Sequence, residues 1–233
     1  MHVITAQDID IDGFAGLRER HYVMDSRVFG DHRKAESAEG LGAFVYLADA
    51  HFLRLGSTGR HAHRDIDIVT LVMNGRLLHR GTLGDESVFD AGSVLVQRAG
   101  RQGFEHNEMN PDETPNRIIQ IWMKPDQVQD VACHEVRQWP SKGSACVYRS
   151  SEGNAATLLE VILLSVGESL RFGRDSGLYL VSGTARIGKD GDVLVPEQSY
   201  ISGNSMTASV ETLFAQTLFA QTECRLLHIY TLS

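Results

Sequence analysis

The sequence predicts an all-β protein made of two similar domains, and three observations support this prediction. Short runs rich in Val, Ile, Leu and aromatic residues recur along the chain, separated by turns of Gly, Asn and Asp. No long segment shows the 3.6-residue period of an amphipathic helix. Two strand-like segments recur in the second half of the chain at nearly one offset. Many short strands between such turns are typical of β-sandwiches and β-barrels.

The predicted strands follow from these apolar runs. Asn74-Gly75 lies between two of the runs and favours a tight hairpin, because both residues tolerate a positive φ. Short helices are expected only in the N-terminal stretch and over Asp126–Val136. The predicted strands are Ala43–Leu55, Ile66–Met73, Arg76–Arg80, Val94–Gln97, Ile118–Met123, Thr157–Leu164, Leu178–Val181, Val193–Val195 and Leu226–Leu232.

An internal repeat predicts the domain organisation. The segment Arg117–Trp122 (RIIQIW) recurs as Arg225–Tyr230 (RLLHIY) at an offset of 108, and Leu71–Gly75 recurs more loosely as Leu180–Gly183 at an offset of 109. Matches at one offset indicate a duplicated unit. We therefore expect two similar all-β domains, over residues 1–125 and 135–233.

A second, tandem repeat is shorter. TLFAQ occurs at Thr212–Gln216 and again at Thr217–Gln221. Five extra residues in a strand would turn every later side chain to the other face, so this segment is expected to form a bulge or loop. It suggests no function.

Composition limits the kinds of partner. The 233 residues carry a formal net charge of −8, which argues against direct binding of nucleic acid or of anionic lipid. The longest apolar run, Val161–Leu164, is far too short to span a membrane, and the acidic N-terminus is unlike a signal peptide. An odd set of unevenly spaced cysteines (Cys133, Cys146 and Cys224) indicates thiols, so a cytoplasmic protein is expected.

Two short motifs combine metal-binding side chains at strand spacing. His61-Ala62-His63 places two imidazoles on one face of a strand, and His106-Asn107-Glu108 does the same with an imidazole and a carboxylate. One such HxH triplet arises by chance about 0.4 times in a chain with this many histidines, so the pair of motifs carries the prediction. Three imidazoles and a carboxylate on neighbouring strands suit iron, manganese, nickel, copper or zinc and leave positions for other ligands.

The internal repeat supplies a comparison within the chain. Adding the two offsets to the four candidate ligands gives Leu170, Phe172, Phe214 and Gln216 in the second half. None of these is a ligand residue. The first domain is therefore expected to carry the metal site, and the second to be a domain that lacks the ligands.

These residues also carry a family resemblance. The string HAHRDIDIVTLVMNGRLLHRGTLGD, the triplet HNE and the segment RIIQIWMKPD resemble the pirin family of bicupins, most closely the short bacterial pirin-like proteins. The resemblance covers most of residues 41–125 with specific motifs, and the second half only by general pattern. It implies two tandem cupin-type, jelly-roll-like β-barrels. It also implies a metal, typically iron, held by His61, His63, His106 and Glu108. Some members of the family are quercetinases, which cleave the flavonol heterocycle with oxygen and release carbon monoxide.

The sequence departs from the family pattern at three places. Ala62 replaces the proline of the usual HPH motif, and Asp67 stands where a glutamate is common. The turn AGRQGFEHNE before His106 is one residue longer than the common form, which affects the placement of His106 and Glu108. Because alternate side chains of a strand point to the same side, Asp65 and Asp67 are expected to share a strand face with the histidines. There they would be either partners of the imidazoles or surface carboxylates.

The leading functional hypothesis is a metal-dependent dioxygenase that takes a flavonol-like aromatic and O2. The metal, Fe(II) by resemblance, with Mn, Ni, Co, Cu or Zn as alternatives, would lower the pKa of the bound substrate hydroxyl. Glu108 would be a ligand and also the general base. Phe44, Phe52, Phe104 and Met73 would line the pocket or belong to the core.

Two other hypotheses use the same residues. One is a non-enzymatic, iron-binding and redox-responsive protein that regulates a partner protein, a class that pirins also resemble. The other is a degenerate cupin without metal that serves as a binding module. Fold alone does not separate these hypotheses. The remaining histidines, His79 and His134 included, are expected to be ordinary surface or core residues.

Overall fold

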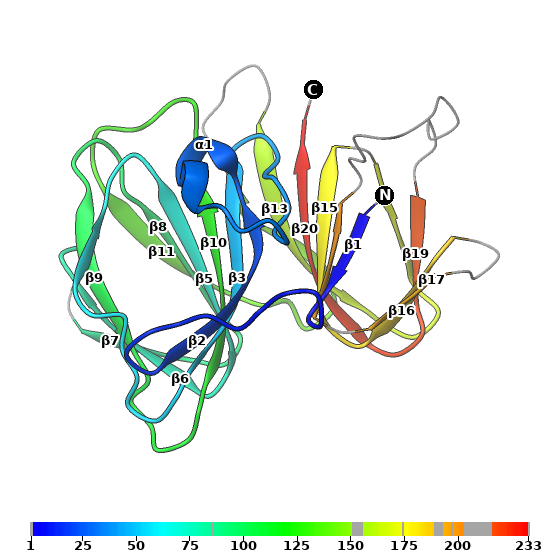
Figure 1. Ribbon diagram of the computed structural model, residues 1–233, viewed down its shortest axis with the longest axis horizontal. Helices are drawn as coiled ribbons and strands as arrows, with labels where there is room; N and C mark the ends of the chain where they lie inside the picture. The colour runs from blue at the N-terminus through cyan, green and yellow to red at the C-terminus, as the bar shows by residue number, and fades with distance from the viewer. Residues whose placement is uncertain are drawn as a thin grey trace. The chain divides into compact units, whose positions relative to one another are not determined.

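The chain folds into two compact units of β-structure (Figure 1). The computed structural model describes residues 2–84, 86–150, 156–173, 175–188, 193–196, 198–202 and 216–232. Ile9–Trp139 form the N-terminal unit, whereas the C-terminal unit combines the residues up to Asp8 with Pro140–Arg149 and the described part of the chain after residue 155. No helix in the described part of the chain is long and apolar enough to cross a membrane.

The N-terminal unit consists of two antiparallel sheets. The six-stranded sheet has the order β11-β8-β5-β10-β3-β2, and the four-stranded sheet has the order β4-β9-β6-β7. A short helix α1 (Ser26–Phe29) and a 3-10 turn (Gly30–His32) follow β2. The strands are β2 (Leu17–Met24), β3 (Phe44–Phe52), β4 (His61–His63), β5 (Asp67–Asn74), β6 (Arg76–Gly81), β7 (Ser87–Asp90), β8 (Ser93–Arg98), β9 (Phe104–Met109), β10 (Arg117–Met123) and β11 (Cys133–Gln138).

The C-terminal unit repeats this topology. Its six-stranded sheet has the order β1-β18-β15-β20-β13-β12, and its four-stranded sheet the order β14-β19-β16-β17. The strands are β1 (His2–Thr5), β12 (Gly143–Arg149), β13 (Thr157–Leu164), β14 (Ser169–Phe172), β15 (Ser176–Ser182), β16 (Thr184–Ile187), β17 (Val193–Pro196), β18 (Ser199–Ser202), β19 (Gln216–Ala220) and β20 (Cys224–Thr231). Each strand from β12 to β20 corresponds to the strand ten places earlier, and β1 occupies the place that β11 has in the N-terminal unit.

The all-β prediction and the predicted strands are confirmed, each strand within three residues at either end. Gly75 has φ 70° at the turn between β5 and β6, but these two strands belong to different sheets and do not pair, so the predicted hairpin at Asn74-Gly75 is wrong. The helix expected over Asp126–Val136 is wrong. Its last residues belong instead to β11, whose backbone pairs with the open edge of β8 and whose side chains are all exposed. Polar, exposed residues of this kind are typical of an edge strand.

The boundaries of the units differ from the expected ranges of 1–125 and 135–233. β1 pairs with β18, with Ile4 opposite Tyr200, so the first strand of the chain belongs to the C-terminal unit. β11 extends the N-terminal unit to Trp139. Both differences arise because an unpaired sheet edge accepts any strand that can reach it, whatever its position in the sequence. Of the TLFAQ repeat, residues 212–215 lie outside the described residues, and the second copy contributes to β19.

Apolar side chains from both sheets of each unit form its core. In the C-terminal unit they come from β13 to β20, among them Phe172, Leu178 and Leu226. His228 on β20 is one of the buried polar residues of this unit, and neither of its ring nitrogens has a hydrogen-bond partner among the described residues. The carboxylate of Glu160 on the neighbouring strand is 3.7 Å from Nδ1, too long for a hydrogen bond.

This buried histidine predicts a pH dependence of stability. Burial lowers the pKa of His228 from 6.5 to about 4. Between these pH values, His228 binds a proton in the unfolded chain but not in the folded chain. Stability is therefore lost as pH falls from 6.5 towards 4. We expect His228→Gln to lose less stability over this interval, by at most about 1.4 kcal/mol per pH unit. Urea unfolding of both proteins between pH 7.5 and 4.5 measures the difference. Parallel stability curves would contradict this prediction.

Candidate metal site

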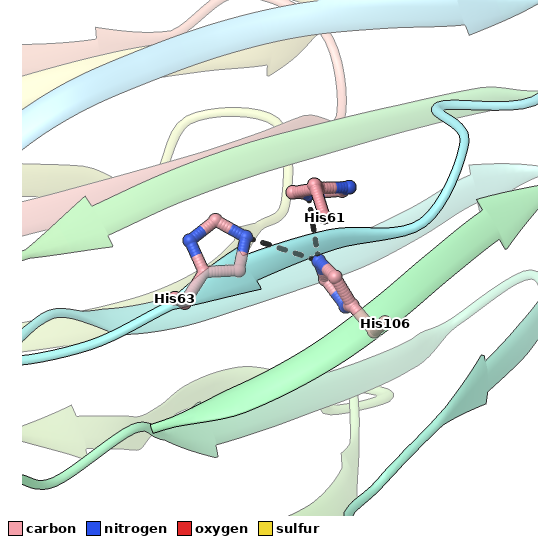
Figure 2. Close-up of side chains that lie close together, drawn as sticks. All are labelled: His61, His63 and His106. Carbon is pink, nitrogen blue, oxygen red and sulfur yellow. Dashed lines mark hydrogen bonds between the residues drawn. The ribbon is translucent and has the colours of Figure 1, made fainter. Parts of the chain in front are cut away.

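Two short strands bring the histidines of both motifs together. In the four-stranded sheet of the N-terminal unit, β4 pairs with β9 so that His61 lies opposite His106 and His63 opposite Phe104. Side chains alternate along a strand, so His61 and His63 face the same side. Figure 2 shows the three imidazole rings turned towards one another from these two strands.

The contacts between the rings are close. The Nε2 atom of His106 is 3.0 Å from Nε2 of His61 and 3.1 Å from Nε2 of His63. The three side chains form the one group of possible metal ligands found among the described residues, with ligand atoms within 4.8 Å of one another. His106 is fully buried, His63 is nearly so and His61 is half-buried.

The other ring nitrogens indicate where the protons are. Nδ1 of His61 lies 2.9 Å from the carbonyl oxygen of Gly59, which can only accept, so Nδ1 carries the proton and Nε2 keeps its lone pair. Burial, with a smaller contribution from the neighbouring histidines, lowers the pKa of His63 to about 4 and that of His106 to about 2. At neutral pH His63 and His106 are therefore uncharged.

This arrangement fits a bound metal ion. Lone pairs of uncharged imidazoles repel one another unless a proton or a cation lies between them. Two nitrogens that each lie about 2.1 Å from one ion, at right angles, are about 3.0 Å apart, which is the separation observed. The donor set suits first-row transition metals.

Glu108 lies close in the sequence but is held differently. Its carboxylate is fully buried; Oε1 accepts a hydrogen bond from Thr70 Oγ1 (2.9 Å) and Oε2 one from Gln120 Nε2 (2.8 Å). It does not belong to the group formed by the three histidines. Burial raises the pKa of Glu108 to about 7, although the two hydrogen bonds act in the opposite direction. Trp122 Nε1 in turn donates to the Gln120 side-chain oxygen (3.0 Å).

The two aspartates do not join the histidines. Asp67 accepts a hydrogen bond from Arg98 at 3.1 Å, and Asp65 is exposed with φ 57°. The alternation of side chains does not extend to these aspartates, because the chain turns at Asp65 and passes from β4 in one sheet to β5 in the other. A count of alternate residues holds only within one continuous strand.

The aromatic candidates divide between core and site. Phe44 and Phe52 are fully buried core residues. Phe104 lies beside the cluster, with ring centroids 5.4 Å from His63 and 5.2 Å from His106. Trp122, which the sequence did not single out, is 5.6 Å from His63. A cavity of about 370 Å³ adjoins this side of the site, with His63 and Phe104 in its lining.

His79, expected from the sequence to be an ordinary surface or core residue, lies next to the cluster. It is buried on β6, with Nε2 3.1 Å from Nδ1 of His106. Gln97, on β8, contacts the same His79 nitrogen at 3.0 Å. His79 lies 27 residues from His106 in the chain, and a single histidine at that distance forms no recognisable motif.

The C-terminal unit has apolar residues at the corresponding positions. On β9, Glu108 lies opposite His79 of β6; on β19, Leu218 lies opposite Ile187 of β16. The strand pairing thus makes Leu218, and not Gln216, the counterpart of Glu108, and Leu218 is a buried core residue. Phe214 lies outside the described residues. A separate cavity of about 340 Å³ in this unit is lined in part by Phe172 and His228.

Comparisons with known proteins agree with this picture. The pirin family matches residues 21–123. A Zymomonas mobilis protein named "putative quercetin 2,3-dioxygenase" is 32% identical over 136 residues, which cover 57% of this chain and 55% of that protein. A Pseudomonas aeruginosa protein, also named "putative quercetin 2,3-dioxygenase", is 30% identical over 144 residues. The match covers 56% of this chain and 62% of that protein. The chain therefore spans little more than half the length of these relatives.

Solved structures show the same fold. The bacterial pirin YhhW of Escherichia coli, solved in complex with nickel(II), has a TM-score of 0.78 at 19% identity, covering 98% of this chain and 97% of that one. A quercetin 2,3-dioxygenase from Acinetobacter baumannii has a TM-score of 0.67 at 15% identity, covering 98% and 85%. The predicted tandem cupin-type fold is thereby confirmed. Residues 21–123 thus match the pirin family, and the chain shares the fold of these solved structures.

Proposed function

We propose that the chain binds a divalent metal ion in its N-terminal unit and acts as a dioxygenase on flavonol-like aromatics. One observation carries the proposal, namely the convergence of three imidazoles through Nε2 at 3.0 and 3.1 Å. The names of the relatives and the nickel(II) complex of YhhW support it. Iron(II) is the metal we propose, because the nitrogen-rich donor set suits it and it is typical of pirins.

His61, His63 and His106 would hold the metal. When bound, the ion supplies Lewis-acid and redox chemistry, since it favours deprotonation of a substrate hydroxyl group and takes part in electron exchange with dioxygen. The protein supplies a rigid frame, because the paired strands β4 and β9 set the positions of the rings. Burial of His63 and His106 excludes water from two of the three ligands.

Glu108 would accept the substrate hydroxyl proton. Its two oxygens are held by Thr70 and Gln120, and its pKa of about 7 suits a group that takes and returns a proton near neutral pH. The sequence predicted Glu108 as both a ligand and a base. The base is the role we propose first, because its carboxylate lies outside the group of three histidines.

Aromatic side chains beside the cluster suit a planar substrate. Phe104 and Trp122 both pack within 6 Å of the His63 ring, measured between centroids. Such rings bind an aromatic substrate through offset or edge contacts. The adjoining cavity of about 370 Å³ is of the size found in small-molecule sites.

Removal of single ligands tests the metal site. We expect the purified full chain, reconstituted with iron(II) under anaerobic conditions, to hold about one metal ion. His61→Ala and His106→Ala should each lose most of it, because a three-nitrogen site loses a third of its donors. His51→Ala is the matched control, since His51 lies on β3 and its Nε2 faces Asp49. Metal analysis by mass spectrometry gives the result, and full metal content in both ligand variants would exclude the site.

Substrate turnover tests the activity. Aerobic incubation with quercetin should consume the flavonol absorbance and release carbon monoxide with at least one of iron, manganese, nickel, cobalt or copper bound. Glu108→Gln should retain the metal and lower kcat about 10²- to 10⁴-fold, as for loss of a general base. Loss of metal in this variant would instead make Glu108 a ligand. A metal-loaded protein without turnover would leave the non-enzymatic, iron-binding regulatory role or another substrate.

Glu108 also predicts how the metal-free protein responds to pH. The pKa of Glu108 is about 7 in the folded chain, against a reference value of 4.5. The folded chain therefore holds a proton that the unfolded chain releases, so the contribution of Glu108 to stability is present below pH 4.5 and is lost as pH rises through 7. Glu108→Gln removes this loss. We expect the variant to gain stability relative to the wild type between pH 5 and pH 8, by at most about 1.4 kcal/mol per unit. Urea unfolding of the chelator-treated proteins measures the free energy of unfolding at each pH. A difference between variant and wild type that stays the same from pH 5 to pH 8 would contradict this prediction.

A further inference from the structure

A buried histidine outside the ligand group contacts its central member. β6 and β9 are paired, and this pairing brings His79 to the nitrogen of His106 that faces away from the other two ligands. The Nε2 atom of His79 is 3.1 Å from Nδ1 of His106, and both rings are more than nine-tenths buried. One of these two nitrogens must therefore donate a proton to the other.

The Gln97 side chain decides which of the two is the donor. Its amide nitrogen, which can only donate, lies 3.0 Å from the same Nε2 atom of His79. His79 Nε2 then accepts from both neighbours, and the His79 proton lies on Nδ1. His106 consequently carries its proton on Nδ1 and presents the lone pair of Nε2 to His61 and His63.

We propose that His79, oriented by Gln97, is a positioning residue that keeps the proton of His106 on Nδ1 and so leaves Nε2 open to bind the metal. This inference rests on the metal site proposed above. It assigns a role to a histidine outside the two ligand motifs. Hydrogen bonds of this kind to a ligand imidazole fix its tautomer and the orientation of its ring.

The metal affinity of His79 variants tests the proposal. In His79→Leu the Nδ1–H of His106 is buried without an acceptor, and we expect affinity for nickel(II) to fall about 10- to 100-fold. His79→Gln restores an acceptor through its side-chain oxygen and should recover most of the affinity. His51→Leu, on β3 of the same unit, is the control and should bind as the wild type does. Competition with a metallochromic chelator measures all four proteins.

Gln97→Glu separates positioning from electrostatics. The carboxylate has nearly the same size but can only accept, so His79 must now donate through Nε2. His106 Nδ1 then becomes the acceptor, and the His106 proton moves to Nε2, the ligand atom. We expect weaker nickel(II) binding despite the added negative charge near the metal. If charge alone mattered, this variant would bind the cation more tightly, which would overturn the proposal.

The proton itself can be observed without metal. In chelator-treated full chain labelled with ¹⁵N-histidine, we expect Nε2 of His106 to show the chemical shift of an unprotonated nitrogen in the wild type and of a protonated one in Gln97→Glu. A His106→Gln sample assigns the signals. Protonated Nε2 in the wild type would overturn the proposal, as would full metal affinity in His79→Leu.

The outcomes distinguish this inference from the proposed function. If His61→Ala and His106→Ala bind metal as the wild type does, the metal site is wrong and His79 has no ligand to position. If those two variants lose metal while His79→Leu keeps it, the site stands and the positioning role is wrong. Should His79→Leu fail to fold, as judged by near-ultraviolet circular dichroism, His79→Gln and Gln97→Glu still decide, because both conserve size and polarity.

Discussion

The site depends on one local constraint, the pairing of β4 with β9 in a register that places His61 opposite His106. This register brings three imidazoles to a common point and removes two of them from water. Because burial lowers the pKa values of His63 and His106, the cluster does not relieve its crowding by protonation at neutral pH. A bound cation fits such an arrangement, since it attracts all three lone pairs at once.

Around this cluster, the six-stranded sheet supplies hydrogen bonds. Thr70 on β5 and Gln120 on β10 hold Glu108, whereas Gln97 on β8 acts on the cluster through His79. Polar groups buried in a core are costly unless they are paired, and here each one named forms a hydrogen bond. The sheet opposite the ligands thus gives each of these groups a hydrogen-bond partner, although Oε1 of Gln97 is buried without a partner among the described residues.

The C-terminal unit shows the same topology without the site. Leu218 and Ile187 occupy the positions of Glu108 and His79, and both contribute to an apolar core. A cupin-type unit therefore needs no metal ligands for its own packing. His228 occupies the place of Gln120 in the repeat but has no hydrogen-bond partner among the described residues. Its burial lowers stability in acid, which no apolar residue at that position would do.

The sequence by itself determined the strands, the duplication and the two motifs that supply His61, His63, His106 and Glu108. These features depend on local patterns, namely apolar runs between turns and the alternation of side chains along a strand. The same local rules failed at the turn of Asp65, where the alternation of side chains is interrupted. They also failed over Asp126–Val136, where a helix was predicted but the last residues form a strand that pairs with the open edge of β8.

Only the tertiary structure decided which neighbours complete the site. His79 and Gln97 lie 27 and 9 residues from His106, on two different strands, and their contacts arise from the order of strands in two sheets. Strand order likewise placed β1 in the C-terminal unit and made Leu218 the counterpart of Glu108. Periodicity says which face a side chain occupies, but hydrogen-bond partners come from adjacent strands, and adjacency is a property of the fold.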